Sequence, residues 1–150
     1  MRRSIFILTL AAVVLGGCST ARIQTPSGFA AQHDDAYDYR ASDGEGVVLA
    51  VRSEKNDPEG DLEFWSSAVD VRLRKAGYAA QDRRDVKSID GRAGKQLRYE
   101  VASEGRTLAF WVTVFVTGRR VVIVEAGGDS ELFTPKTKVV EAAIASLRVG

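Results

Sequence analysis

Hydrophobic residues follow two different periods along this chain. Between Asp61 and Gly77 they recur every three or four positions, which predicts an amphipathic helix. The members of this repeat are Leu62, Trp65, Val69, Leu73 and Ala76. Asp61 has the side chain of a helix N-cap, and Gly77 tolerates the left-handed conformation that commonly follows a helix end.

Two segments on either side of this helix predict strands. Residues 47–51 form a β-branched run between glycines and a polar stretch, which is typical of a buried strand. After Tyr78 the hydrophobic period becomes two, and residues 96–102 alternate between apolar and polar side chains. We therefore expect the face of this strand that carries Gln96, Arg98 and Glu100 to be in water.

A hairpin follows these strands. A turn at Glu104-Gly105 leads into residues 107–117, which are apolar on both faces and therefore predict a central strand. A second turn at Gly118-Arg119 joins this strand to residues 121–126. Strands connected by such tight turns are antiparallel.

The C-terminal segment predicts a second helix, opened by Thr134 and Pro135 with proline at its first position. Its apolar stripe consists of Val140, Ala143, Ile144 and Leu147. The order is thus strand, helix, a meander of about four strands and a helix. This order predicts an α+β fold, in which an antiparallel sheet is flanked by helices on opposite faces, in a single globular domain over residues 29–150.

The first eighteen residues have the pattern of an export signal. Arg2 and Arg3 precede an apolar run over residues 5–15, which is much shorter than the ~20 apolar residues of a membrane-spanning helix. The next residues, Leu15-Gly16-Gly17-Cys18, resemble the lipobox of bacterial lipoproteins. The alternative is an ordinary secretory signal followed by a spare thiol.

The lipobox resemblance implies a lipid anchor at Cys18. Its sulfur would carry a diacylglyceryl group, residues 1–17 would be removed as the signal peptide, and the new amino group would be acylated. Two or three acyl chains hold a protein stably on a membrane. Ser19, where inner-membrane lipoproteins of Gram-negative bacteria have Asp, implies the outer membrane, with the domain in the periplasm or at the cell exterior. Residues 18–28 are predicted to be the lipidated N-terminus and a flexible tether.

Composition excludes several classes of site. The 150 residues contain one cysteine and one histidine, so an internal disulfide is impossible and a zinc site lacks its usual ligands. The formal net charge is +1 and becomes −1 once Arg2 and Arg3 are removed with the signal. A charge this small gives no general footprint for nucleic acid, so we expect no nucleic-acid partner. No cofactor is implied.

Several short segments of the domain are similar to the PsbP-like superfamily. They are Phe64-Trp65, Gly77-Tyr78, Arg98-Tyr99-Glu100, the hairpin FWVTVFVTGRRVVIVEA and the closing helix. The superfamily includes an extrinsic oxygen-evolving subunit of photosystem II, a nuclear-import factor that binds the Ran GTPase, and bacterial effector-loading chaperones. The resemblance, over residues 37–147, implies an α/β/α sandwich that binds other proteins. No functional residue is implied by it.

Other candidate chemistry in the domain is sparse. The loop over residues 56–63 is rich in acidic side chains that suit Ca²⁺, but its spacing does not fit an EF-hand, and helix capping explains the acidic residues. His33 is expected to be an exposed imidazole. Residues 91–94 are expected to form a turn before a strand, which is not the setting of a phosphate loop. We therefore expect neither a catalytic nor a metal site.

Basic residues and tryptophans give two further hypotheses. The basic residues in and after the first helix are Arg72, Arg74, Lys75, Arg83, Arg84 and Lys87. They suit a basic face toward anionic lipid or an acidic partner, although interspersed aspartates favour a mixed, solvated surface. Trp65 and Trp111 are expected to be in the core or to cover the sheet. Trp111 is the better candidate for a pocket or interface.

Three functions are compatible with these features. The first is a lipid-anchored, noncatalytic domain that binds a protein partner in the assembly or maintenance of the bacterial envelope. The second is a carrier of a small apolar ligand or lipid, held between helix and sheet. The third is a hydrolase whose carboxylates are brought together by the fold. We favour the first, in which the protein is not an enzyme.

The lipid anchor gives a direct prediction. Cys18→Ser removes the sulfur that would accept the lipid, so the variant should lose acyl labelling and leave the membrane fraction. Metabolic labelling with a fatty acid and cell fractionation measure both effects. A variant that remains labelled and membrane-bound contradicts the lipobox interpretation.

Overall fold

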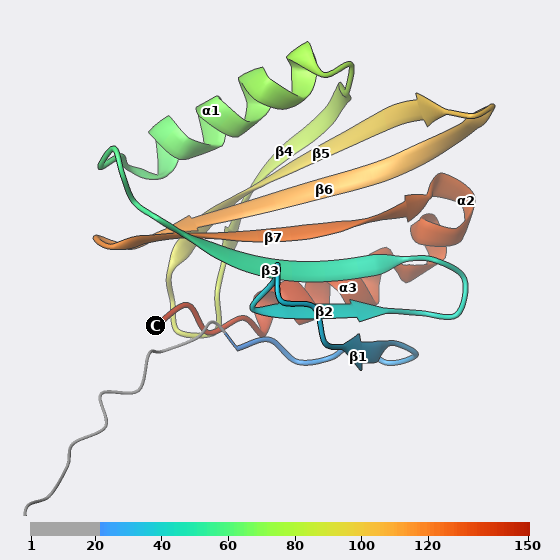
Figure 1. Ribbon diagram of the computed structural model, residues 1–150, viewed down its shortest axis with the longest axis horizontal. Helices are drawn as coiled ribbons and strands as arrows, with labels where there is room; N and C mark the ends of the chain where they lie inside the picture. Colours follow the sequence, from blue (N-terminus) through green and yellow to red (C-terminus); the bar gives the residue numbers. More distant parts are fainter. Residues whose placement is uncertain (1–21) are drawn as a thin grey trace, which may run out of the picture.

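One antiparallel sheet of seven strands forms the centre of the molecule (Figure 1). The computed structural model describes residues 22–150, so the predicted signal peptide, the predicted lipobox and Cys18 lie outside the described residues. The strands are β1 (Ala30–Gln32), β2 (Tyr39–Ser42), β3 (Val48–Lys55), β4 (Ala79–Lys87), β5 (Ala93–Ser103), β6 (Arg106–Val116) and β7 (Arg120–Asp129). Their order across the sheet is β1-β2-β3-β7-β6-β5-β4, and each neighbouring pair is antiparallel.

Helices cover both faces of the sheet. The first, α1 (Leu62–Lys75), connects β3 to β4 and lies on one face. On the other face lie α2 (Ser130–Phe133), the 3₁₀ turn η1 (Thr134–Lys136) and α3 (Thr137–Ala145), which follow β7 (Figure 1). This arrangement confirms the predicted α+β fold, with a four-strand meander from β4 to β7 and helices on opposite faces.

The helix α1 is capped as the sequence predicts. The Asp61 carboxylate accepts a hydrogen bond from the backbone N–H of Phe64 at 2.8 Å, and Gly77 has a φ of +92° just after the helix. Its side chains Leu62, Trp65, Val69 and Leu73 pack on Val112, Val114, Val121 and Ile123 of the sheet. The Tyr99 hydroxyl donates to Asp70 Oδ1 at 2.7 Å and ties β5 to the helix. Burial, with this hydrogen bond, raises the pKa of Tyr99 above its ordinary value.

The larger core lies under the C-terminal helices. It consists of side chains from β3, β6, β7, α2 and α3 and from the residues after α3. Its large, fully buried members include Leu49, Phe115, Val122, Val124, Phe133 and Leu147. Because β6 and β7 contribute to the cores on both faces, the prediction that residues 107–117 form an interior strand is confirmed.

The C-terminal helix and the first strands differ from the prediction. The Asp129 carboxylate accepts a hydrogen bond from the N–H of Glu131 at 3.0 Å and starts α2 before the expected Thr134. Pro135 lies in η1, because it lacks the N–H that a continuous helix needs there. The sequence does not predict β1 and β2, which have only three and four residues.

The polar face of β5 is buried in part, which contradicts the expectation that it is in water. Gln96 is buried, and the Arg98 side chain is only 12% exposed. Gln96 donates to Thr113 Oγ1 at 3.3 Å and accepts from Arg98 Nε at 2.8 Å. Arg98 also pairs with Glu141 of α3 and lies 3.6 Å from the ring centroid of Trp111. These contacts satisfy polar groups whose burial is otherwise unfavourable.

The described part of the predicted tether, residues 22–28, lies on the domain. Arg22 and Arg148 exchange two backbone hydrogen bonds of 3.1 and 2.7 Å. The N–H of Gln24 donates to Ser146 Oγ at 2.9 Å. The expectation of a flexible tether is therefore wrong for these residues, because their backbone groups find partners in the segment that follows α3.

The turn between β4 and β5 holds the C-terminal segment. Asp90 Oδ2 accepts hydrogen bonds from the N–H groups of Val149 and Gly150, each at 3.1 Å. The Ser88 hydroxyl donates to the other carboxylate oxygen at 2.5 Å. Burial acts to raise the pKa of Asp90, but these hydrogen bonds outweigh it and hold the pKa below its ordinary value.

Asp90→Ala should therefore destabilise the domain by about 0.5–1.5 kcal/mol at neutral pH, since the N–H groups of Val149 and Gly150 lose their acceptor. A lowered pKa means that the stabilisation by Asp90 is present above pH ~4 and is lost as the carboxylate protonates at lower pH. Urea unfolding at pH 7 and pH 3 should show a difference between wild type and variant that shrinks in acid. Asp35→Ala, at a side chain that is 96% exposed, is the control. Equal midpoints for the two variants at pH 7 contradict the role of Asp90.

Candidate functional site

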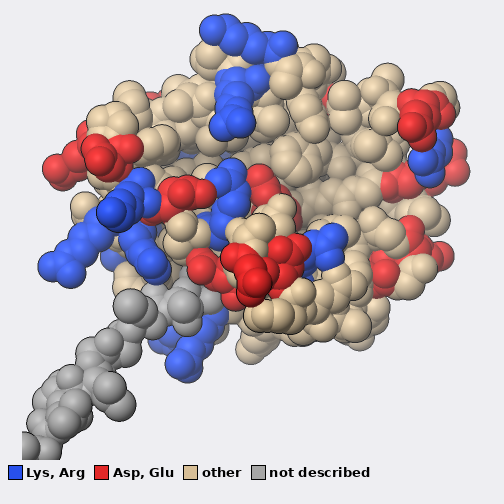
Figure 2. All heavy atoms as spheres, in the orientation of Figure 1, with Lys and Arg blue, Asp and Glu red and all other residues tan. Residues whose placement is uncertain are grey.

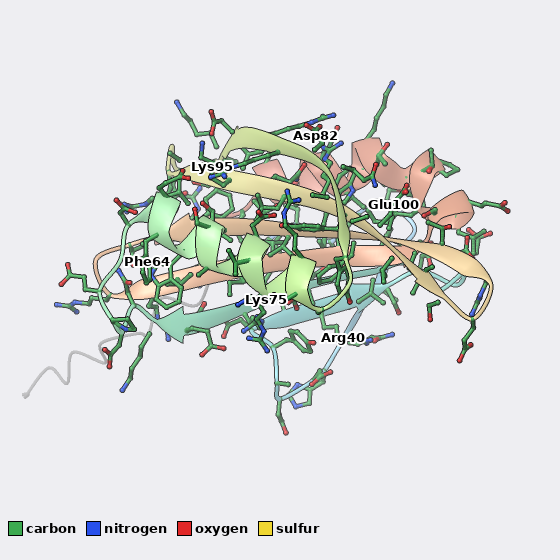
Figure 3. All side chains as sticks on the ribbon, turned by 90° about the horizontal axis from the view of Figure 1, so that it is seen from above. Arg40, Phe64, Lys75, Asp82, Lys95 and Glu100 are labelled. Carbon is green, nitrogen blue, oxygen red and sulfur yellow. The ribbon has the colours of Figure 1, made fainter. Side chains whose placement is uncertain are left out.

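The helix α1 leaves part of its sheet face open, and a groove of about 340 Å³ lies beside its C-terminal end. This groove, the sheet groove, is lined by Tyr37, Arg40, Gly46, Val48, Ala50, Tyr78, Val101, Leu108, Ala109, Phe110, Glu125, Ala126, Gly127 and Gly128. Figure 3 looks onto this face of the molecule. The helix runs from Phe64 near its start to Lys75 at its end, and Arg40 lies beyond its edge (Figure 3).

Apolar side chains form most of the wall of the sheet groove. Gly77 turns the chain after α1, and the ring of Tyr78 then lies against Phe110 of β6, with 5.4 Å between the ring centroids. Val48 and Ala50 of β3 contribute the surface on the other side. A concave apolar surface of this kind is typical of sites that bury apolar groups of a ligand.

Two side chains of opposite charge also lie in the sheet groove. Arg40 of β2 and Glu125 of β7 flank Ala50 in the register of the sheet, so their backbones are about 10 Å apart. Arg40 Nη1 donates to Gln32 Oε1, and Glu125 Oε1 lies 3.5 Å from Arg52 Nη2. Because each charged group has further hydrogen-bonding capacity, the groove offers one cationic and one anionic position around an apolar floor.

The floor of the sheet groove depends on glycine at position 127. A Cβ atom there would lie 2.7 Å from the carbonyl oxygen of Ala109 on the neighbouring strand. At Gly128 a Cβ atom would lie 3.2 Å from Val47 Cα. This glycine pair lets β7 pass close to both neighbours. Two sequence signals could have indicated the groove. They are this glycine pair and Tyr78, which directly follows the glycine after α1.

A second groove of about 730 Å³ lies between α1 and β3. Trp65 lines it, is half-buried and donates from Nε1 to Asn56 Oδ1 at 2.7 Å. Two acidic residues, Glu54 and Asp57, line the same groove. The Glu54 side chain is 59% exposed and pairs with Arg52 at 2.9 Å. This is a solvated ion pair, which differs from the desolvated carboxyl group that serves as a general acid.

The acidic segment over residues 56–63 consists of the connection from β3 to α1 and the first two residues of that helix. Asn56 Nδ2 donates to the carbonyl oxygen of Gly60 at 3.1 Å, and Asn56 Oδ1 accepts from the Gly60 N–H at 2.9 Å. Glu63 accepts from Arg83 Nη2 at 2.8 and 2.9 Å. Among the described residues no group of three or more His, Cys, Asp and Glu side chains is placed to hold a metal ion. The contacts in this loop stabilise the connection.

The other candidate residues lie apart from the sheet groove. The His33 side chain is 93% exposed beside Asp35, and residues 91–94 lie at the start of β5. Trp111 is only 6% exposed and packs against Phe133, with 4.9 Å between ring centroids. The hypothesis that Trp111 lines a pocket or interface is wrong, because the C-terminal helical segment covers that face of the sheet.

The predicted basic face is divided between the two sides of the sheet. Arg83 pairs with Glu63 of α1 on one side, whereas Arg84 lies 3.5 Å from Glu141 of α3 on the other. Arg74 pairs at 2.9 Å with an aspartate one helical turn before it. These residues form the mixed, solvated surface that the interspersed aspartates indicate.

Comparison with known proteins identifies the fold. No protein-family model matches the chain, and no curated protein matches its sequence. The solution structure of cyanobacterial PsbP (CyanoP) from Synechocystis sp. PCC 6803 superposes with a TM-score of 0.61 and 11% identity, over 94% of this chain and 99% of that one. The fold is PsbP-like. At this level of identity, the similarity concerns the arrangement of the elements.

Two further structures share the PsbP-like arrangement. LpqN, which is involved in cell envelope biogenesis of Mycobacterium tuberculosis, superposes with a TM-score of 0.68 and 11% identity, over 85% of this chain and 82% of that one. PA94, a protein of unknown function from Pseudomonas aeruginosa, superposes with a TM-score of 0.60 and 14% identity, over 85% of each chain.

The close approach at Gly127 in this PsbP-like sheet gives a prediction. Gly127→Ala should destabilise the domain by about 1–3 kcal/mol, because the added methyl group forces neighbouring strands apart. Gly118→Ala adds the same methyl group at a turn where a Cβ atom has no neighbour within 4 Å, and should change stability by less than about 0.5 kcal/mol. Urea unfolding measures both. Equal midpoints for the two variants contradict the close approach.

Proposed function

We propose that this protein is a lipid-anchored, noncatalytic component of the bacterial envelope whose sheet groove binds a segment of a partner protein. The observation that carries the proposal is the uncovered part of the sheet beside α1. There, apolar side chains of four strands and Tyr78 line the groove together with one arginine and one glutamate. Such a surface provides affinity through apolar burial and orientation through the two charges.

The geometry of the groove favours a partner segment with both apolar and charged side chains. Arg40 and Glu125 lie on either side of the apolar floor at Ala50. A segment that crosses the groove therefore meets a cation, an apolar surface and an anion in turn. Opposite charges at fixed spacing select the direction in which such a segment lies.

The fold comparisons support a role at the envelope. LpqN, which has the same fold, is involved in cell envelope biogenesis in its own organism. We propose that this chain also acts in the cell envelope, because its first eighteen residues resemble a lipoprotein signal with a lipobox that ends at Cys18. Assembly or maintenance of the envelope is the proposed role, and the outer membrane of a Gram-negative host the proposed location.

The proposed attachment is through lipid on Cys18. Among the helices in the described part of the chain, none has the length and apolar character needed to cross a bilayer. Two or three acyl chains on one cysteine are sufficient for stable attachment.

A carrier of a small apolar ligand is the second candidate function. The volume of the sheet groove, about 340 Å³, is within the range of roughly 300–1,000 Å³ of small-molecule sites. The walls formed by Val48, Tyr78 and Phe110 suit such a ligand. The groove lies beside the end of α1, at the surface, rather than between the helix and the sheet.

The proposal predicts that a charged side chain in the apolar wall of the sheet groove weakens binding of the partner segment. A photo-crosslinking amino acid at Val48 should attach one partner in cells, which mass spectrometry identifies, whereas the same group at Val71 should not. With that partner purified, Val48→Glu should raise Kd at least tenfold, about 1.4 kcal/mol, because the segment would bury an unpaired carboxylate. Val71→Glu is the matched control, since Val71 is 51% exposed on α1.

Arg40→Glu provides a second test at the edge of the groove, where it reverses the cationic charge; because it also removes the contacts of Arg40 with Gln32 and Asp34, its unfolding midpoint is measured alongside. It should also weaken binding. Equal affinities for the Val48 and Val71 variants contradict the proposed site. A bound small molecule in native mass spectrometry of the full chain, lost in Val48→Glu, would instead support the carrier function.

A further inference from the structure

The described chain begins and ends at the same end of the sheet. Arg22 is the first described residue and pairs through its backbone with Arg148. At the turn between β4 and β5, the N–H of Ile89 donates to the carbonyl oxygen of Leu147 at 3.0 Å. The strands β3, β4 and β6 end here, and β5 and β7 begin here. The sheet groove, which includes Gly128 near the end of β7, lies toward the opposite end.

This end of the domain carries a group of exposed basic side chains, which we call the basic end. They are Arg22, Lys55, Arg92, Arg119, Arg120 and Arg148. None of the six forms an ion pair within residues 22–150. Lys55 and Arg120 lie directly opposite each other on β3 and β7. Like charges in this arrangement destabilise a sheet, so a bound anionic surface would relieve an existing repulsion.

Acidic residues at the basic end are fewer and partly engaged. Asp90 accepts hydrogen bonds from backbone N–H groups, Asp61 caps α1 and Glu54 pairs with Arg52. The remaining acidic residues at this end are Asp57 and Glu59. The turns and strand ends at the opposite end carry Asp43, Glu45, Glu104, Asp129 and Glu131. In Figure 2, Lys and Arg gather in the lower part of the end where the C-terminus lies in Figure 1, with Asp and Glu above them, and Asp and Glu predominate at the other end.

The proposed lipid anchor is attached close to the basic end. Cys18 and Arg22 are four positions apart in the sequence, and a chain of that length spans at most about 14 Å. The 11 residues of β6 extend about 37 Å from one end of the sheet to the other. Because backbone hydrogen bonds fix Arg22 on the domain, the end of the sheet near Arg22 stays close to an anchor at Cys18, whereas the acidic end is free of that limit.

We infer that the basic end lies on the membrane surface and binds the anionic headgroups of phospholipids, while the sheet groove is directed away from the bilayer. This inference rests on the lipid anchor of the proposed function. Basic residues that lie within a Debye length of an anionic surface, about 8–10 Å, are attracted to it. Ile89 is 57% exposed at the turn between β4 and β5, where it is placed to enter the interface.

The orientation can be measured on the full, lipidated chain in vesicles. With Cys18 modified, an introduced cysteine is the only free thiol, because the chain has one native cysteine. A fluorescent NBD label is attached at Ile89→Cys or, at the opposite end, at Ser103→Cys. In vesicles of phosphatidylethanolamine and phosphatidylglycerol, the label at position 89 should shift to shorter wavelength, gain at least twofold in intensity and be quenched by brominated lipid. The label at position 103 should do none of these.

The role of charge is tested with the same label at position 89. The double variant Arg92→Gln/Arg148→Gln, or 0.5 M NaCl, should reverse at least half of the intensity gain, and phosphatidylcholine vesicles should give a smaller gain. Arg106→Gln with Lys75→Gln removes two charges at the opposite end and should leave the gain unchanged.

Flotation with the vesicles separates this inference from the proposed anchor. A chain that floats but gives the same signal at positions 89 and 103 overturns the orientation and leaves the anchor intact. A gain at position 89 that is insensitive to salt and to Arg92→Gln/Arg148→Gln overturns headgroup binding. A chain that does not float overturns the anchor and the orientation with it.

Discussion

The fold depends on one constraint, which is that the hairpin of β6 and β7 is apolar on both faces. Each face must be covered by another layer to remove it from water. A 14-residue helix such as α1 is about 21 Å long, whereas the 11-residue strand β6 is about 37 Å long. A single helix therefore leaves part of its face open, and that part is the sheet groove. On the other face, α2, η1 and α3 follow one another and cover Trp111 and Phe115. The difference in cover leaves the sheet groove open beside the end of α1.

The features that were predicted correctly depend on residues close in sequence. Asp61 and Gly77 act within a few residues of the ends of α1, and the strict alternation of β6 is visible without a partner strand. The features that were missed depend on contacts between distant residues. Arg98 has the polarity of an exposed side chain, but Glu141, 43 positions later, pairs with it under α3. The groove was missed for the same reason, since Arg40, Tyr78 and Glu125 come from segments that only the sheet order brings together.

Asn56, Asp70 and Asp90 each belong to a hydrogen-bond network, and this limits where function can lie. Asn56 both donates to and accepts from backbone groups, and Asp90 accepts from two backbone N–H groups. Substitution of either residue would therefore disturb the conformation of a loop. The pKa of Asp70 illustrates the same point: burial acts to raise it, but hydrogen bonds from Tyr99 and Arg74 hold it below its ordinary value. A carboxylate stabilised in its charged form is a poor proton donor at neutral pH. In the sheet groove, by contrast, Arg40 and Glu125 face an open surface and have capacity for a partner.

The position of the first described residues connects the proposed anchor to the groove. A tether of ten flexible residues would let the domain turn freely, and the direction of the groove would carry no information. Arg22 is instead paired with Arg148, so only three residues separate it from Cys18. With lipid on Cys18 and the basic end on the bilayer, the strands would run away from the membrane, and the groove would lie toward the far end of a sheet about 37 Å long. A partner segment in the groove would then be held at a defined height above the bilayer. The length of the sheet, rather than the length of a linker, would set that height.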